Sequence, residues 1–96
     1  MQRTNKFPMT AAGYSALQDE LRHRIQGERG HLIERIQQAI ADDSNLADNS
    51  EYHTAQTEQQ TNEARIAELE EKLARAEIID ISRLAGDSIR FGEFGG

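Results

Sequence analysis

The chain has 96 residues, a formal charge of −6, a mean hydropathy of −0.76 and no cysteine. This length allows at most one small domain, and the low apolar content favours an elongated helical object over a globule with a large core. The negative charge argues against unaided binding to nucleic acid, and the lack of cysteine excludes disulfides and thiolate metal sites. No apolar run has the length of a membrane span or a signal-peptide core, so we expect a cytoplasmic protein with no membrane contact.

A first long helix is predicted from about residue 10 to residue 41. Pro8 favours an extended lead-in, and Thr10 is a suitable N-cap. Apolar residues then recur at helical spacing, in steps closer to an eleven-residue repeat than to a heptad: Tyr14, Leu17, Leu21, Ile25, Leu32, Ile36 and Ala39. Gly27 and Gly30 weaken the middle of this helix, and we expect one helix with a soft centre, with a break at Gly30 as the alternative.

A second helix is predicted from about residue 48 to residue 76. Its seam follows alternating steps of three and four, which is a heptad: Tyr52, Ala55, Gln59, Asn62, Ile66, Leu69, Leu73 and Ala76. Asp48 is the expected N-cap, and Glu51 three residues later would complete a capping box. Charge pairs four residues apart, from Glu68 to Lys72 and from Glu71 to Arg75, should support the far end of this helix.

These two helices predict an all-α fold, a long antiparallel two-helix coiled-coil hairpin over residues 1–77 with an acidic tip at residues 42–51. The large apolar seam residues lie away from the tip, so we expect the best-packed end there. Residues 78–96 have a strand-like pattern, with a second strand beginning near Ile89. We expect them to be a linker and the truncated start of a C-terminal domain.

A short acidic segment joins the two predicted helices. Four carboxylates occur from Asp42 to His53, and no lysine or arginine occurs from residue 36 to residue 64. The segment from Leu46 to Ala55 resembles the signature L-x-E-N-A-E-Y-H-x-A of the Gre-type transcript cleavage factors of bacterial RNA polymerase. Further matches stand in the same order as in this family: Pro8 to Gly13, Leu17 to Leu21, Arg65 to Glu70, Ala76 to Asp80 and Ile89 to Gly92.

The resemblance implies a coiled-coil rod that enters the secondary channel of RNA polymerase. Acidic tip residues would there help the polymerase to hold a second Mg²⁺ and a water, so that it hydrolyses the 3′ end of a backtracked transcript. Transcript and DNA would be met only within the polymerase complex. The factor would be an accessory factor rather than an enzyme, with no cofactor of its own, and a monomer, with a dimer through an exposed strand as the alternative.

Carried over residue by residue, the resemblance implies two groups of site residues. Catalytic positions would be Asp48 and Asn45, and Asp43 is added as an acid that could take the role of Asn45; Asp48 and Asp43 would then be the ligands of the shared Mg²⁺. The residues expected to contact the partner at the tip are Leu46, Asn49, Glu51 and Tyr52.

The sequence departs from the family at two of these positions. Asn45 stands where the family has an acid, and Asp48 stands where it has a glutamate. Asn offers only a neutral oxygen and cannot act as a base, so we expect reduced cleavage unless Asp43 or Asp42 takes the vacant role. A non-cleaving regulator that occupies the channel and a plain coiled-coil interaction module are the alternatives.

Structural explanations also exist for several of these residues. Asn45 is a candidate for a left-handed residue at the end of the first helix, and His53 is expected to be solvated. The basic residues of the first helix are expected to form a solvated face, with contact to the transcript as the alternative: Arg22, Arg24, Arg29 and Arg35.

Overall fold

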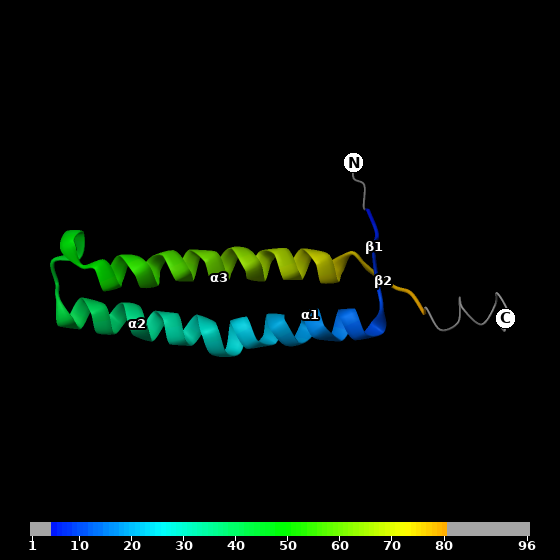
Figure 1. The fold of residues 1–96 in the computed structure, drawn as a ribbon, viewed down its shortest axis with the longest axis horizontal. Helices are drawn as coiled ribbons and strands as arrows, with labels where there is room; N and C mark the ends of the chain where they lie inside the picture. The colour runs from blue at the N-terminus through cyan, green and yellow to red at the C-terminus, as the bar shows by residue number, and fades with distance from the viewer. Residues whose placement is uncertain (1–4, 81–96) are drawn as a thin grey trace, which may run out of the picture.

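The computed structural model describes residues 5–80 and confirms the helical hairpin. Two long helical arms run antiparallel, joined by a short loop at one end, and two short strands lie side by side at the other end (Figure 1). Along the chain, the elements are β1 (Phe7–Met9), α1 (Ala11–His23), η1 (Arg24–Glu28), α2 (Arg29–Asp42), η2 (Leu46–Asp48), α3 (Ser50–Ala74) and β2 (Ala76–Ile78). None of these helices is both long and apolar enough to cross a membrane.

The first arm begins where the sequence predicts. The hydroxyl oxygen of Thr10 accepts a hydrogen bond from the backbone N–H of Gly13 at 3.0 Å, which satisfies one of the free donors of the first turn. The arm ends at Asp42, because Asp43 has extended backbone angles, φ −154° and ψ 107°. Both ends lie within two residues of the predicted bounds.

The middle of the first arm, where the glycines were expected to weaken the helix, forms a π-helical turn, η1, and the helix continues through Gly30 without a break. In this turn the backbone N–H of Arg29 donates to the oxygen of Arg24, five residues earlier. A π turn accommodates one residue more than an α turn.

The π turn explains the unusual spacing of the apolar residues in the first arm. The positions of α1 that turn toward α3 follow heptad steps, and those of η1 and α2 follow the same steps one residue late. The first set is Tyr14, Leu17 and Leu21, and the second is Ile25, Arg29, Leu32, Ile36 and Ala39, all of them buried or half-buried. The apparent eleven-residue repeat is therefore a heptad with one added residue, which the π turn absorbs.

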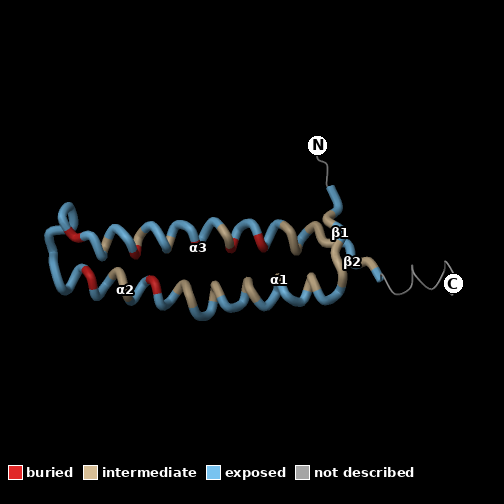
Figure 2. The backbone as a smooth tube through the Cα atoms, in the orientation of Figure 1, coloured by how far each residue is buried: buried red, intermediate tan, exposed pale blue. Residues whose placement is uncertain are grey.

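The heptad seam of α3 is confirmed. Every predicted seam position is buried or half-buried, and the fully buried ones are Ala55, Asn62, Ile66 and Leu69. In Figure 2 these positions face the opposite arm, where Leu32 and Ala39 are also buried. The core is thus a single thin layer between two helices.

The prediction that packing is best at the base is confirmed for α3, which buries Ile66 and Leu69 there, but not for α1. No residue of α1 is fully buried, whereas the tip half buries Leu32, Ala39 and Ala55. Tyr14 and Leu17, in the first turns of α1, stay half-exposed.

The strands β1 and β2 pair in parallel at the base, with Phe7 opposite Ala76 and Met9 opposite Ile78. Hydrogen bonds of 2.8 Å extend this pairing from Phe7 N to Arg75 O and from Ile79 N to Met9 O. The strand-like pattern after the second helix is confirmed, but its partner is the lead-in to the first helix. The predicted strand near Ile89 lies outside the described residues.

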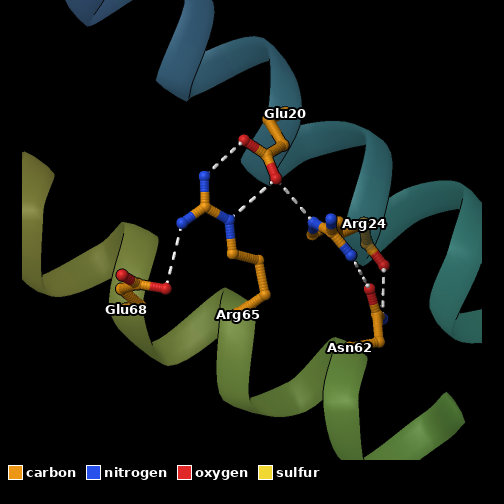
Figure 3. Close-up of polar contacts among 5 residues, drawn as sticks. All are labelled: Glu20, Arg24, Asn62, Arg65 and Glu68. Atoms are coloured by element: carbon orange, nitrogen blue, oxygen red, sulfur yellow. Dashed lines mark hydrogen bonds and ion pairs between the residues drawn. The ribbon is translucent and has the colours of Figure 1, made fainter.

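A polar network joins the two arms near the middle of the rod, and we call it the mid-rod clasp (Figure 3). Arg65 on α3 donates two hydrogen bonds of 2.9 Å to Glu20 on α1, and Arg24 donates to the same carboxylate at 2.8 Å. Arg24 also donates to the side-chain oxygen of Asn62 at 2.9 Å, while the Asn62 amide donates to the backbone oxygen of Arg24 at 3.3 Å. Glu68 completes the clasp by accepting from Arg65 at 2.9 Å.

Two further arginines of the first arm reach across to α3. Arg29 makes a bidentate pair with Glu63 at 2.8 and 2.9 Å, and Arg35 donates to Glu58 at 2.6 Å. With Arg24, these residues hold the arms together, so the interpretation of the basic residues as a solvated face is wrong for three of the four. Their long side chains span the edge of the thin core.

Candidate functional site

The tip is the loop of residues 43–49, which connects α2 to α3 and contains the short 3₁₀ turn η2. The backbone N–H of Asp48 donates to Asn45 O at 3.1 Å, and that of Asn49 donates to Leu46 O at 3.2 Å. These bonds close the turn on itself. Every residue of the loop is exposed except Asn49.

The N-cap of α3 is Asn49, and the prediction of Asp48 for this role is wrong. The Asn49 side-chain oxygen accepts from the backbone N–H of Tyr52 at 2.9 Å. Asp48 belongs to η2, which places it one residue too early to cap the helix. The predicted capping box is also absent, because the Glu51 carboxylate lies 3.8 Å from Arg35 on the other arm.

The remaining polar atoms of the Asn49 side chain are turned inward. Its amide donates to the backbone oxygens of Ala39 at 2.7 Å and of Asp43 at 2.8 Å, and only 6% of the residue is exposed. Sequence reasoning assigned Asn49 to partner contact and missed this structural role. The available signal was that Asn is a preferred N-cap residue, but Asp48 beside it was an equally good candidate.

Asn45 connects the two predicted catalytic carboxylates. Its backbone N–H donates to Asp43 Oδ1 at 3.0 Å, and its side-chain amide donates to Asp48 Oδ2 at 3.1 Å. The backbone of Asn45 has φ −80° and ψ 85°, so the interpretation as a left-handed helix-ending residue is wrong. The structure thus brings together the three predicted catalytic positions in one hydrogen-bonded group.

The other predicted tip residues surround this group without joining it. Leu46 is 37% exposed at the outer end of the loop. Tyr52 is half-buried, accepts a bond from Gln56 at 3.3 Å through its hydroxyl and meets the ring of His53 edge-on at 5.4 Å. Leu46 and His53 are accordingly accessible at the tip, whereas Tyr52 is partly covered.

The described residues of the tip do not form a complete metal site. Within residues 5–80, no three or more His, Asp or Glu side chains gather closely enough to hold an ion by themselves. Asp43 and Asp48 each engage one carboxylate oxygen in the bonds to Asn45, and the second oxygen of each makes no hydrogen bond to any described residue. Carboxylate oxygens are the ligands that Mg²⁺ prefers, so these residues fit an ion whose other ligands come from elsewhere.

The charge of the chain is concentrated in the tip half. Residues 30–64 contain seven carboxylates and one arginine, so this half accounts for the whole net charge of −6. The single arginine, Arg35, is engaged by Glu58 and Glu51. The exposed tip therefore presents a negative field, which attracts cations and basic surfaces.

Comparison with known proteins shows similarity over most of the chain. The family description "Transcription elongation factor, N-terminal", which covers GreA and GreB, matches residues 7–78. The chain is 55% identical over 87 residues to the transcription elongation factor GreA of Rhodopseudomonas palustris (strain TIE-1), covering 91% of this chain and 54% of the relative. It is 55% identical over 87 residues to GreA of Bradyrhizobium diazoefficiens, which covers 91% of this chain and 55% of the relative. It is 52% identical over 88 residues to GreA of Chelativorans sp., which covers 92% of this chain and 55% of the relative. The chain spans about half the length of these relatives.

Proposed function

Because this chain belongs to the family of GreA and GreB transcription elongation factors, through their N-terminal region, we propose that it acts on the elongation of transcription by bacterial RNA polymerase. In this proposal the hairpin enters the secondary channel of the polymerase with its tip first. It acts there on backtracked complexes, as an accessory factor that stimulates cleavage of the transcript by the polymerase.

One observation carries the proposal. Asp43 and Asp48 lie exposed at the end of a rod that is only two helices thick, and both are held by Asn45. A thin rod can reach into a narrow channel, and carboxylates fixed at its end arrive with little loss of side-chain freedom. The negative charge of the tip half favours entry tip first wherever the channel or its metal ions are positive.

Asp43 and Asp48 are the residues that would hold a Mg²⁺ shared with the polymerase. The chemistry that such an ion supplies is the polarisation of a phosphodiester and the activation of a water. Asn45 contributes no negative charge, and its amide occupies one oxygen of Asp48, so the tip offers fewer anionic ligands than a tip with an acid at this position. We therefore expect weak stimulation of cleavage.

A second candidate function follows from the same bond. If the Asn45 amide keeps Asp48 from ligating, the tip would occupy the channel without stimulating cleavage, and the protein would be a non-cleaving regulator. Both candidates require the same partner and the same orientation of the rod. They differ in the response of the stalled complex.

The test is a cleavage assay on purified backtracked elongation complexes with this chain, its Asn45→Asp variant and an Asp48→Asn variant as the matched loss-of-charge control. We expect slow stimulation by the unchanged chain, an increase of about tenfold or more with Asn45→Asp, and loss with Asp48→Asn. Competition for the polymerase against a labelled GreA relative measures binding separately. Competition without cleavage would favour the non-cleaving regulator, and no competition at any concentration would favour a plain coiled-coil module and overturn the proposal.

A further inference from the structure

The side chain of Asn49 is the point at which both arms and the tip loop meet. Its amide group donates to Ala39 O in the last turn of α2 and to Asp43 O just after it, and its oxygen accepts from Tyr52 N in the first turn of α3. The three distances are 2.7, 2.8 and 2.9 Å, and the residue is 6% exposed. Both N–H donors and the acceptor of one buried amide are therefore used.

From this buried amide, hydrogen bonds run outward through the loop to the exposed carboxylates. Asn49 fixes the backbone of Asp43, whose carboxylate accepts from Asn45 N, and Asn45 in turn donates to the carboxylate of Asp48. The backbone N–H of Asn49 also donates to Leu46 O, which ties the other end of the turn. Asn49 is therefore linked to Asp43 and Asp48 through the loop without a hydrogen bond to either carboxylate.

We propose that Asn49 is a positioning residue, which fixes the tip loop against the ends of α2 and α3 and thereby sets the geometry of the Asp43, Asn45 and Asp48 group. The inference deepens the proposed function and rests on it for its effect on cleavage. Its structural part concerns the isolated chain alone.

Loss of this anchor should loosen the loop and leave the rod in place. The arms are held independently by the mid-rod clasp and by the Arg29–Glu63 and Arg35–Glu58 pairs, none of which involves the loop. The carbonyls of Ala39 and Asp43 would lose a buried donor, which is unfavourable wherever water does not replace it. The loop would then sample other conformations, and the carboxylates would reach their target less often.

Two substitutions separate the functions of this side chain. Asn49→Asp keeps the size and the acceptor for Tyr52 N but removes both donors and turns a carboxylate oxygen toward two carbonyls. Asn49→Ala removes the cap as well. Ser50→Ala is the matched control, because Ser50 is the neighbouring exposed residue and makes no side-chain hydrogen bond in the described part of the chain.

The first measurement is amide hydrogen exchange by NMR on the isolated chain. For Asn49→Asp we expect exchange at residues 45–49 to rise by about tenfold or more, with protection retained in the middle of α3, since a buried hydrogen bond contributes about this factor. Ser50→Ala should leave the loop unchanged. Loop exchange that stays unchanged in both Asn49 variants would overturn the inference, whatever the polymerase does.

The second measurement is the dependence of transcript cleavage on factor concentration. For Asn49→Asp we expect the maximal rate to fall about tenfold while the half-saturating concentration changes by less than about twofold, because the rod still binds and only the tip is misplaced. A defect in the fold of the rod would instead raise the half-saturating concentration. If the unchanged chain stimulates no cleavage, the proposed stimulation of cleavage fails, and hydrogen exchange alone decides whether Asn49 positions the loop.

Discussion

Arg65 on α3 donates two parallel hydrogen bonds of 2.9 Å to Glu20 on α1, a residue 45 positions earlier in the chain. Arg24 binds the same carboxylate, so Glu20 receives three charge-assisted bonds from two guanidinium groups (Figure 3). The Arg65 and Arg24 hydrogen bonds lower the pKa of Glu20 from its ordinary value of 4.5 to about 2. The ionised form of Glu20 therefore stabilises the folded hairpin.

This pKa predicts loss of stability in acid. In the unfolded chain Glu20 takes up its proton near pH 4.5, and in the folded chain only near pH 2. Its contribution is thus fully present above about pH 4.5 and is lost as the pH falls from there toward about pH 2. We expect the melting temperature, followed by circular dichroism, to fall over this interval.

The substitution Glu20→Gln should lower the free energy of unfolding by about 1–2 kcal/mol at pH 7. The loss is no larger because 30% of the Glu20 side chain is exposed, so that solvent screens its charge. The variant should also lose less stability in acid than the unchanged chain. Glu34→Gln is the control, because Glu34 is exposed and has no ion pair with a described residue. Equal effects of the two substitutions at pH 7 would show that the bonds to Glu20 do not stabilise the fold.

Asn62 gives a second prediction for the clasp. The residue is 2% exposed on the α3 seam and bonds both the side chain and the backbone of Arg24. Asn62→Ala should lower the free energy of unfolding, measured in urea, by about 1–3 kcal/mol, because both bonds are lost in a buried place. Asn62→Leu should cost less than about 1 kcal/mol, since an apolar seam residue replaces the amide and Arg24 keeps Glu20. A leucine variant as unstable as the alanine variant would contradict this reasoning.

The glycines of the first arm give a third prediction. Gly30 lies in α2 with nothing within 4 Å of the place where a Cβ would stand, so Gly30→Ala should raise the free energy of unfolding by about 0.5–1 kcal/mol. At Gly13 a Cβ would lie 3.3 Å from the capping hydroxyl of Thr10. Gly13→Ala should therefore raise the free energy of unfolding by less than Gly30→Ala does, or lower it. Thermal unfolding of the two variants side by side checks the order, and a larger gain at Gly13 would be evidence against the capping role of Thr10.

Much of the fold follows from the sequence because helical periodicity is a strong signal. The heptad of α3 and the cap at Thr10 were both predicted correctly. The π turn was not, since the spacing of the first arm fits either an eleven-residue repeat or a heptad with one added residue. The partner helix decides between them, because its heptad obliges the first arm to follow the same steps.

The contacts between arms and the details of the tip could not be predicted. Which carboxylate an arginine such as Arg24 or Arg65 meets depends on the register of the two helices, and the sequence contains no direct measure of it. Asp48 and Asn49 are both good N-cap residues, and only the 3₁₀ turn, which includes Asp48, selects Asn49. The pairing of β1 with β2 was missed because three-residue strands carry almost no pattern of their own.

The added residue in the first arm gives the last prediction. Deletion of Gly27 should convert η1 into an ordinary α turn and bring the heptad of α1 into step with that of α2, with Leu32 and Ala39 still facing α3. Because a glycine also leaves the helix, we expect the free energy of unfolding to stay within about 1 kcal/mol or to rise. The NMR shifts of the tip loop should remain unchanged.

Deletion of Gln37 is the matched control for Gly27, since it also removes one exposed residue from the same arm. It lies beyond the π turn, so the residues after it rotate by about 100° relative to those before it. Ala39 would then leave the seam, and its oxygen would no longer face the Asn49 amide. We expect a loss of about 3 kcal/mol or more and displaced shifts throughout the tip loop, because a buried contact and the loop anchor fail together. If deletion of Gly27 were as harmful as deletion of Gln37, the π turn would be a required part of the rod rather than the place where it absorbs an extra residue.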